Sequence, residues 1–314
     1  MGKLVSSLKL IFAGSGEFGL PTLRALIDGG HDIVQVVSQP DRPAGRGRAL
    51  TPTPIASFAS TQNLPVLKTA NINAEQLPPA DVMVVIAFGQ KIDEKIVHHP
   101  RLGSVNLHAS ILPKYRGAAP INWAIIRGEH VAGNSVIRLA PRMDAGPVLG
   151  QSSLEIGEIE TAGELHDRLA EDGAPLVQTV LSQLAAGSAV ETPQDDSQAT
   201  IAPKLSREAS KLDFSRPADE IANQIRGMYP WPGCRVRLID ASGAENARLT
   251  LVRARPAGAA RTTPGGIDDS EFVSTASGAF EVVELQPEGK KPMSLAAFRN
   301  GHRWDATMRL EPVA

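Results

Sequence analysis

The chain has a single cysteine, Cys234, among its 314 residues. One thiol excludes an intrachain disulfide, and no Cys and His residues are spaced as zinc ligands, so we expect no metal site. No apolar run reaches the roughly 18 to 20 residues that a membrane-spanning helix needs. A secretory signal and an Arg-rich transit segment are also absent, which predicts a cytoplasmic protein without membrane contact.

An excess of either charge is lacking too, since 32 Lys and Arg stand against 34 Asp and Glu, for a formal net charge of −2. Such a chain has no general attraction for nucleic acid, so any RNA contact must come from a local basic patch. Charged residues make up 21% and apolar residues 42%. This composition indicates a folded globular protein rather than a disordered one, long enough for one large domain or two moderate ones.

Strand and helix patterns alternate through the first two hundred residues. Apolar, β-branched runs predict strands at 8–14, 32–39, 80–89, 103–109 and 134–140. A helix is expected over 20–29, and the apolar spacing of 160–187 indicates a pair of helices. This alternation is typical of an α/β domain with a mostly parallel sheet.

The pattern changes after Gly187, where a polar stretch rich in turn formers replaces it. Beyond that stretch, 211–233 holds one helix, and the rest reads as short strands separated by Gly turns, which favours a small barrel or sandwich. We therefore predict a larger N-terminal domain over 1–189, a linker over 190–208 and a smaller C-terminal domain over 209–314.

The most informative stretch is NLHASILPKYRGAAPINWAIIRGE, residues 106–129. Residues two apart on a strand point to the same face, so Asn106 and His108 are expected to lie side by side at a strand end. One offers an uncharged N–H donor and the other a titratable proton carrier. By itself an N-x-H pair is weak, because a strand-end His is often just bonded to a neighbouring backbone group.

The whole string resembles the active-site signature of the folate-dependent formyltransferases, in which an Asn, a His and a later Asp surround the transferred carbon. The resemblance marks Asp144 in RLAPRMDAGPVLGQ as the third catalytic residue. It implies that Asn106 stabilises the oxyanion that develops on the formyl oxygen. His108 would add a hydrogen bond and move protons, and Asp144 would orient His108.

The same resemblance implies a fold and a formyl donor. It predicts a Rossmann-like N-terminal domain and an OB-like C-terminal barrel, with 10-formyltetrahydrofolate as the donor and no metal. The folate-contacting loop matches at Ser110, Ile111, Leu112 and Pro113. Phe88 and Gly89 are further candidate folate contacts, and the pterin rim falls near Gln90 and Lys91. Two departures from the family pattern affect this pocket: FGQKID at 88–93, and HASILP at 108–113 in place of the common HGSLLP.

QPDRPAGRGR, residues 39–48, places three arginines among glycines and prolines, a composition that predicts a flexible loop rather than a regular element. It resembles the insertion that distinguishes family members acting on methionyl initiator tRNA from those acting on small molecules. The resemblance makes Arg42 and Arg46 candidate tRNA contacts, together with Lys204 and Arg207 in the linker. A solvated basic loop is the alternative. We expect a monomer.

Three other functions stay open at this point. GSGEFG at 14–19 matches the G-x-G-x-x-G dinucleotide fingerprint, with Asp41 about twenty residues on, which suggests a nicotinamide-dependent oxidoreductase. The glycines are equally explained by a tight turn that needs positive φ and close packing. Formyltransferases of nucleotide amino sugars share the NLH and LPKYRG motifs. A catalytically silent RNA-binding protein is the third alternative.

Overall fold

The computed structural model describes residues 7–44 and 49–313. By their contacts they divide into two compact units that interleave along the chain. The first unit comprises Met1–Gly117, Gly133–Leu154 and His166–Ile201, and the second comprises Ala118–Ala132, Glu155–Leu165 and Ala202–Ala314. The boundaries expected near residues 189 and 209 follow the sequence pattern and stay a prediction.

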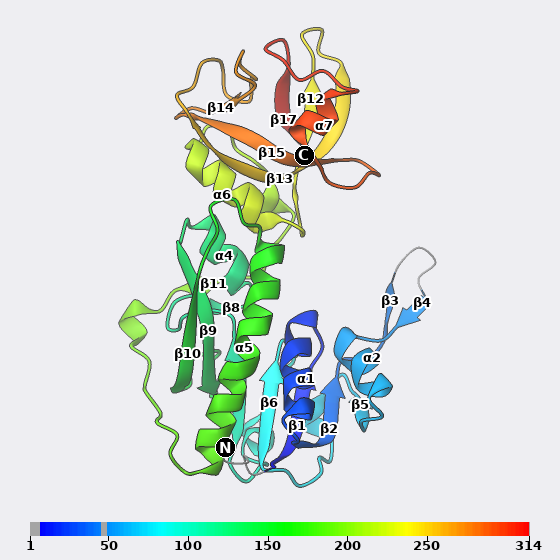
Figure 1. The fold of residues 1–314 in the computed structure, drawn as a ribbon, viewed down its shortest axis with the longest axis vertical. Coiled ribbons are helices and arrows are strands. Elements are labelled where there is room, and N and C mark those ends of the chain that lie inside the picture. The colour runs from blue at the N-terminus through cyan, green and yellow to red at the C-terminus, as the bar shows by residue number, and fades with distance from the viewer. Residues whose placement is uncertain (1–6, 45–48, 314) are drawn as a thin grey trace. The chain divides into compact units, whose positions relative to one another are not determined.

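A seven-stranded sheet forms the centre of the first unit, in the order β10-β9-β7-β6-β1-β2-β5 (Figure 1). The neighbours from β7 to β5 run parallel, and β9 pairs antiparallel with β7. The mostly parallel sheet predicted from the alternating pattern is thus confirmed. Its strands are β1 (Lys9–Gly14), β2 (Asp32–Ser38), β5 (Val66–Lys68), β6 (Val82–Ile86), β7 (Ser104–His108), β9 (Val131–Arg138) and β10 (Val148–Glu155).

Short helices and turns surround this sheet. They are η1 (Glu17–Gly19), α1 (Leu20–Asp28), α2 (Pro54–Thr61), η2 (Ile72–Ala74), α3 (Glu94–Val97) and η3 (Asp196–Gln198). The helix expected over 20–29 is α1. One core cluster combines sheet residues such as Ile11 and Met83 with Ile72 of η2 and Ile96 of α3, so these two short elements cover one face.

The pair of helices predicted over 160–187 is wrong, because the segment forms one continuous helix, α5 (Ala162–Ala185), with Pro175 inside it. A proline removes one helical hydrogen bond, and packing along the helix compensates for the loss. A Cβ at Gly173 would lie 2.5 Å from the Leu107 side chain, so this glycine lets α5 lie directly on β7. Gln178 donates to the Ala25 carbonyl of α1 at 2.6 Å, and the two helices lie side by side (Figure 1).

The glycines of GSGEFG pack against the core rather than lining an open turn. A Cβ on Gly14 would meet the Phe12 ring at 2.8 Å and the Ile86 carbonyl oxygen at 2.9 Å, and one on Gly19 would also approach Phe12, at 3.2 Å. None of the three glycines has positive φ, so that part of the turn explanation is wrong. Close packing alone accounts for Gly14 and Gly19.

The arginine segment is more regular than its composition predicted. β3 (Arg42–Ala44) pairs antiparallel with β4 (Ala49–Thr51), and this two-stranded hairpin extends away from the main sheet (Figure 1). The expected flexible loop is therefore wrong for these flanks. Proline is tolerated here because a two-stranded ribbon leaves half of its backbone groups facing solvent. Arg46 and Arg48 lie outside the described residues.

An antiparallel sheet forms the second unit, in the order β14-β15-β13-β12-β17, with β16 also pairing with β15. The Gly266 to Arg309 and Ile267 to Val273 bridges connect one edge strand to the other, so the sheet is nearly closed. The predicted barrel-like C-terminal fold is confirmed. Its strands are β12 (Cys234–Ile239), β13 (Glu245–Gly258), β14 (Val273–Ser274), β15 (Ala279–Pro287), β16 (Met293–Ser294) and β17 (Arg309–Pro312).

Helix α6 (Ala218–Met228) packs against this sheet through residues at helical spacing, among them Ala218, Ile221 and Ile225. The remaining elements are α4 (Pro120–Ile126), η4 (Glu208–Ser210), α7 (Leu295–Arg299), and β8 (Arg116–Gly117), which pairs with β11 (Ile201–Ala202). Within the described ranges, no helix has the length and apolar character needed to cross a membrane.

Candidate active site

Strand β7 carries the two residues singled out by the N-x-H pattern. Leu107, between them, contacts Gly173 of α5, so alternation directs Asn106 and His108 toward the opposite face of the sheet. His108 is buried, with 6% of its surface exposed, and Asn106 is half-buried. The structure therefore places a carboxamide and an imidazole side by side, as expected.

The protonation of His108 is constrained by its neighbours. Its Nε2 lies 2.9 Å from the carbonyl oxygen of Tyr115. A carbonyl only accepts, so Nε2 carries a proton and donates it. The other ring nitrogen, Nδ1, lies 3.7 Å from Oδ2 of Asp144. A proton at Nδ1 would make this an ion pair, and its absence would leave two electron-rich atoms facing each other.

Asp144 lies in the turn between β9 and β10, and a left-handed backbone with φ of 51° directs its carboxylate inward. The same Oδ2 that faces His108 accepts a hydrogen bond from the Gly117 N–H at 2.8 Å. Tyr115 and Gly117 thus contact the histidine and the aspartate from one short segment. The structure brings the three predicted catalytic residues together, although their individual roles remain a proposal.

Asn106 differs from His108 and Asp144 in its hydrogen bonding. Within residues 7–44 and 49–313, no hydrogen bond involves its carboxamide. The side chain is also half-buried, so it stays accessible to an acceptor that arrives with a ligand. An uncommitted N–H donor next to a histidine and a carboxylate can stabilise negative charge on an oxygen while a proton moves nearby.

The predicted folate loop at 110–113 is held by a network that the sequence did not reveal. Ser135 of β9 donates to the Ser110 carbonyl at 2.6 Å and accepts from the Leu112 N–H at 3.0 Å. Gln151 of β10 donates to the Leu112 carbonyl at 2.9 Å. Leu112 is buried, whereas Ile111 and Pro113 remain half-buried and can contact a ligand.

Phe88 and Gly89 follow β6, where Ala87 and Gly89 both have positive φ. The Phe88 ring lies in the core with 2% of its surface exposed, so it cannot stack on a pterin. Its carbonyl accepts a hydrogen bond from Gln39 at 3.2 Å. Any contact of this segment with a ligand would therefore be made by the backbone.

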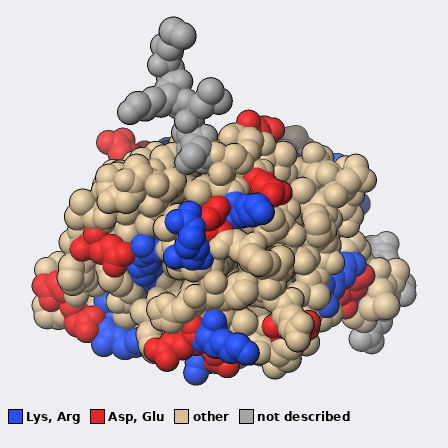
Figure 2. All heavy atoms as spheres, turned by 90° about the horizontal axis from the view of Figure 1, so that it is seen from below, with Lys and Arg blue, Asp and Glu red and all other residues tan. Residues whose placement is uncertain are grey.

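The candidate RNA contacts that the structure describes are all exposed. Arg42 on β3 donates to Gln39 at 3.3 Å and otherwise faces solvent, while Lys204 and Arg207 belong to the second unit. The face shown in Figure 2 has Lys and Arg next to Asp and Glu, without a wide area of one sign. On this face, only local patches of positive charge are available to a polyanion.

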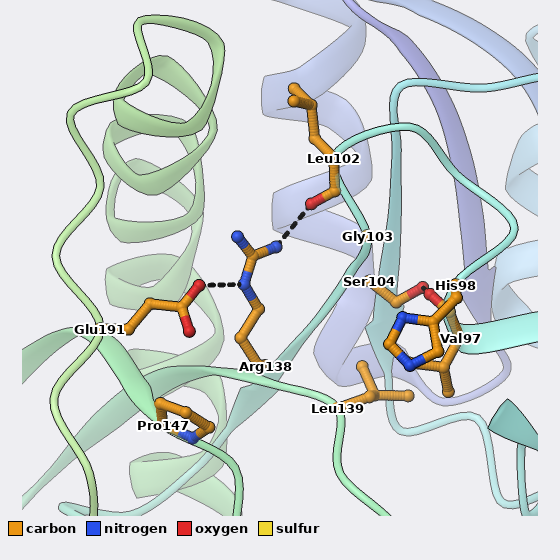
Figure 3. Close-up of a pocket in the computed structure, with 9 residues that line it drawn as sticks. All are labelled: Val97, His98, Leu102, Gly103, Ser104, Arg138, Leu139, Pro147 and Glu191. Carbon is orange, nitrogen blue, oxygen red and sulfur yellow. Dashed lines mark hydrogen bonds and ion pairs between the residues drawn. The ribbon is translucent and has the colours of Figure 1, made fainter.

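One cavity, with a volume of about 420 Å³, is lined by residues other than the three candidate catalytic ones. It is lined by Ser104, at the start of β7, while His108 is at the other end of that strand. Arg138 is already occupied there, donating to Glu191 at 2.8 Å and to the Leu102 carbonyl at 2.6 Å (Figure 3). Ligands of open α/β sheets bind beyond the carboxyl ends of the strands, so we do not assign the reaction to this cavity.

The side chains at the site suit acid–base and oxyanion chemistry. Among the residues that the structure describes, there is no group of three or more His, Cys, Asp or Glu side chains that could hold a metal ion. Asn106 offers a neutral donor, His108 a proton carrier, and Asp144 a carboxylate. These groups can hold a polarised carbonyl while an amine attacks it and loses a proton.

Comparisons with known proteins agree with this chemistry. A family model described as formyl transferase matches residues 8–181, and one described as formyl transferase, C-terminal domain, matches residues 204–303. A methionyl-tRNA formyltransferase of Phenylobacterium zucineum is 38% identical over 310 residues, covering 96% of this chain and 100% of the relative. One from Methylococcus capsulatus is 39% identical over 306 residues, covering 94% and 97%.

A solved structure shares the fold at lower identity. The sugar 3N-formyl transferase WlaRD, determined with dTDP and 5-N-formyl-THF, aligns with a TM-score of 0.63 and 17% identity. The alignment covers 92% of this chain and all of that chain.

Proposed function

The chain belongs to the formyl transferase family, and we propose that it transfers the formyl group of 10-formyltetrahydrofolate to the α-amino group of methionyl initiator tRNA. The relatives that match nearly its whole length at 38% and 39% identity are methionyl-tRNA formyltransferases. The sugar formyltransferase is 17% identical, a likeness that supports the fold and not the acceptor. A tRNA is therefore the better supported acceptor than an amino sugar.

The uncommitted carboxamide of Asn106 is the observation that carries the mechanism. A half-buried donor that has no partner among the described residues is ready for an acceptor that arrives with the substrate, and the formyl oxygen becomes more negative as the amine attacks. Asn106 would donate to that oxygen. Being neutral, it does so without attracting the proton that the amine must lose.

His108 and Asp144 would manage the proton. Because the Tyr115 carbonyl occupies Nε2, the proton that the site can exchange is the one at Nδ1, on the side facing Asp144. The carboxylate stabilises the charged imidazolium and fixes the ring. We assign His108 to proton transfer between the amine and the folate nitrogen, and Asp144 to orienting it.

The loop 110–113 suits a flat, partly apolar donor molecule. Two carbonyls and one N–H of this loop are held by Ser135 and Gln151, so the half-buried Ile111 and Pro113 present a preformed surface. We propose that this surface and the backbone at Phe88 and Gly89 contact the folate.

For the acceptor, we propose that Arg42 and Arg46 contact the tRNA, with Lys204 and Arg207 as contacts from the second unit. Exposure of the three described side chains supports this assignment. We also propose that the protein works as a monomer in the cytoplasm.

The test is a formylation assay with purified full-length protein, 10-formyltetrahydrofolate and methionyl initiator tRNA. Asn106→Ala should lower kcat by about a hundredfold or more, since losing one oxyanion donor typically costs on the order of 3 kcal/mol. Arg42→Ala should instead weaken tRNA binding and make its salt dependence shallower, while folate binding stays unchanged.

Parallel arms use a dTDP-linked amino sugar as acceptor, and NADPH as a ligand. If the amino sugar is formylated faster than the tRNA, the amino sugar is the better candidate for the natural acceptor. Saturable micromolar binding of NADPH would favour an oxidoreductase. Wild-type kcat in a folded Asn106→Ala protein would contradict the oxyanion role while leaving the reaction itself in place.

A further inference from the structure

Gln194 lies inside the polar stretch whose sequence indicated only a linker, yet its side chain reaches the turn that carries Asp144. Its Nε2 donates to the Asp144 carbonyl at 2.8 Å and to the Gly146 carbonyl at 2.7 Å. Its Oε1 accepts from Nε and Nη2 of Arg116 at 3.0 and 2.7 Å. The amide nitrogen and oxygen of one side chain thus bind Asp144 and Arg116, which lie 50 and 78 positions away in the sequence.

The partners fix which way the amide faces. Carbonyl oxygens only accept and a guanidinium only donates, so exchanging the amide nitrogen and oxygen would leave all four hydrogen bonds unmade. This makes Gln194 a clamp of defined polarity between the two carbonyls and Arg116. Neither Glu nor Met could satisfy both sides.

Arg116 provides a fixed anchor for that clamp. Its side chain is 4% exposed, and besides Gln194 it pairs with Asp196 at 2.8 Å. Hydrogen bonds from Arg116 and then from Arg142 hold the pKa of Asp196 below its usual value, so this carboxylate stays charged. A buried guanidinium held by two partners is costly to displace.

Arg116 connects the clamp to His108 and Asp144 through its two neighbours in the chain. Arg116 stands between Tyr115, whose carbonyl accepts from His108, and Gly117, whose N–H donates to Asp144. The backbone of this segment is also tied to Thr200, which accepts from the Tyr115 N–H at 2.8 Å through its hydroxyl and from the Arg116 N–H at 2.9 Å through its carbonyl. The 194–200 segment therefore braces both sides of the His108 and Asp144 pair.

We propose that Gln194 is a positioning residue for formyl transfer, which holds the Asp144 turn so that the carboxylate faces His108. This inference rests on the proposed function. Without the two hydrogen bonds from Nε2, the turn from 139 to 147 would lose the contacts that hold the Asp144 and Gly146 carbonyls. The carboxylate would then be placed by the Gly117 N–H and by the remaining backbone bonds of the turn, such as the one from the Ala145 N–H to the Arg142 carbonyl at 3.2 Å. A displacement of about 1 Å at such a group typically lowers the rate by about a hundredfold.

Gln194→Glu is the diagnostic variant, because it keeps an acceptor for Arg116 but places a carboxylate against two carbonyl oxygens. We expect kcat to fall at least tenfold, with KM for 10-formyltetrahydrofolate within about twofold and an unchanged urea midpoint. Gln198→Ala is the matched control, since this exposed amide in the same segment donates to Asp195 and to none of the candidate catalytic residues. Its kcat should equal that of the wild type.

Two further measurements separate positioning from a general effect on the fold. In an Asp144→Ala background, adding Gln194→Glu should cost nothing more, because the clamp then has no carboxylate to place. In 15N-glycine-labelled protein, the Gly117 amide signal should move in Gln194→Glu and stay in Gln198→Ala. Additive losses of kcat, or an unmoved Gly117 signal, would overturn the proposal. If the wild type formylated nothing, the proposed function would fail, whereas the Gly117 signal would still decide the clamp.

Discussion

A methyl group added at Gly146 would lie 1.8 Å from the Arg138 carbonyl oxygen and 2.9 Å from its carbonyl carbon. Both atoms are backbone, so no side-chain rotation relieves the clash. Restoring an ordinary contact of about 3.5 Å requires the chain to move by more than 1 Å. Gly146 is two residues from Asp144, and its carbonyl is one of the two that Gln194 binds.

The consequence for Gly146→Ala can be estimated from these distances. Overpacking of this kind typically destabilises a protein by about 1–3 kcal/mol. A movement of about 1 Å in the Asp144 turn should lower kcat by about a hundredfold. Activity should therefore fall far more than the stability change alone explains, because a protein with several kcal/mol in reserve stays folded after such a loss.

The assay combines steady-state formylation with urea unfolding, and Gly16→Ala is the matched control. Gly16 has a φ of −78°, which alanine adopts freely, and its added methyl would make an ordinary 3.5 Å contact with Ala87. We expect the control to match the wild type in both measurements. A folded Gly146→Ala protein with kcat within threefold of the wild type would refute the reasoning.

Two further predictions concern the second unit. The hydrogen bonds from Arg253, followed by those from Thr161, lower the pKa of Glu164 to about 2, so its contribution to stability is present above pH 4.5 and lost as the pH falls toward 2. Glu164→Gln should therefore flatten the acid side of the stability profile, by no more than about 1 kcal/mol because the carboxylate is half exposed; an unchanged profile would contradict this. Burial raises the pKa of the Cys234 thiol, so this thiol should resist a disulfide reagent at pH 8 in the native protein and react fully after unfolding. Rapid labelling of the native protein would contradict its burial.

Local patterns predicted much of this fold because the controlling interactions are near in sequence. The alternation of side chains along a strand places Asn106 and His108 on one face of β7, and the apolar runs of β1 and β6 predict strands buried on both faces. Local sequence patterns gave wrong predictions where packing between distant residues determines the structure. The apolar spacing of 160–187 indicates two helices, yet α5 is one continuous helix with Pro175 inside it, and the prolines and glycines at 39–48 hid the hairpin of β3 and β4.

The site was less predictable than the fold for a physical reason. Asp144 was found through the family resemblance, since nothing in its own turn distinguishes it from any other polar turn. Gln194 and Ser135 act through hydrogen bonds to residues 23 or more positions away, and such contacts leave no periodicity to detect. Only the folded chain shows that a polar stretch braces the aspartate.

The nearly closed sheet of the second unit limits how that unit can meet a partner. Both of its edge strands, β14 and β17, are bridged through Gly266 and Ile267. Recognition by strand addition needs a free row of backbone N–H and C=O groups, and bridged edges offer few of them. A partner must therefore be bound by side chains on the outer surface and in the loops. Such a surface can change its specificity by point substitution, without any change to the strand pairing that holds the unit together.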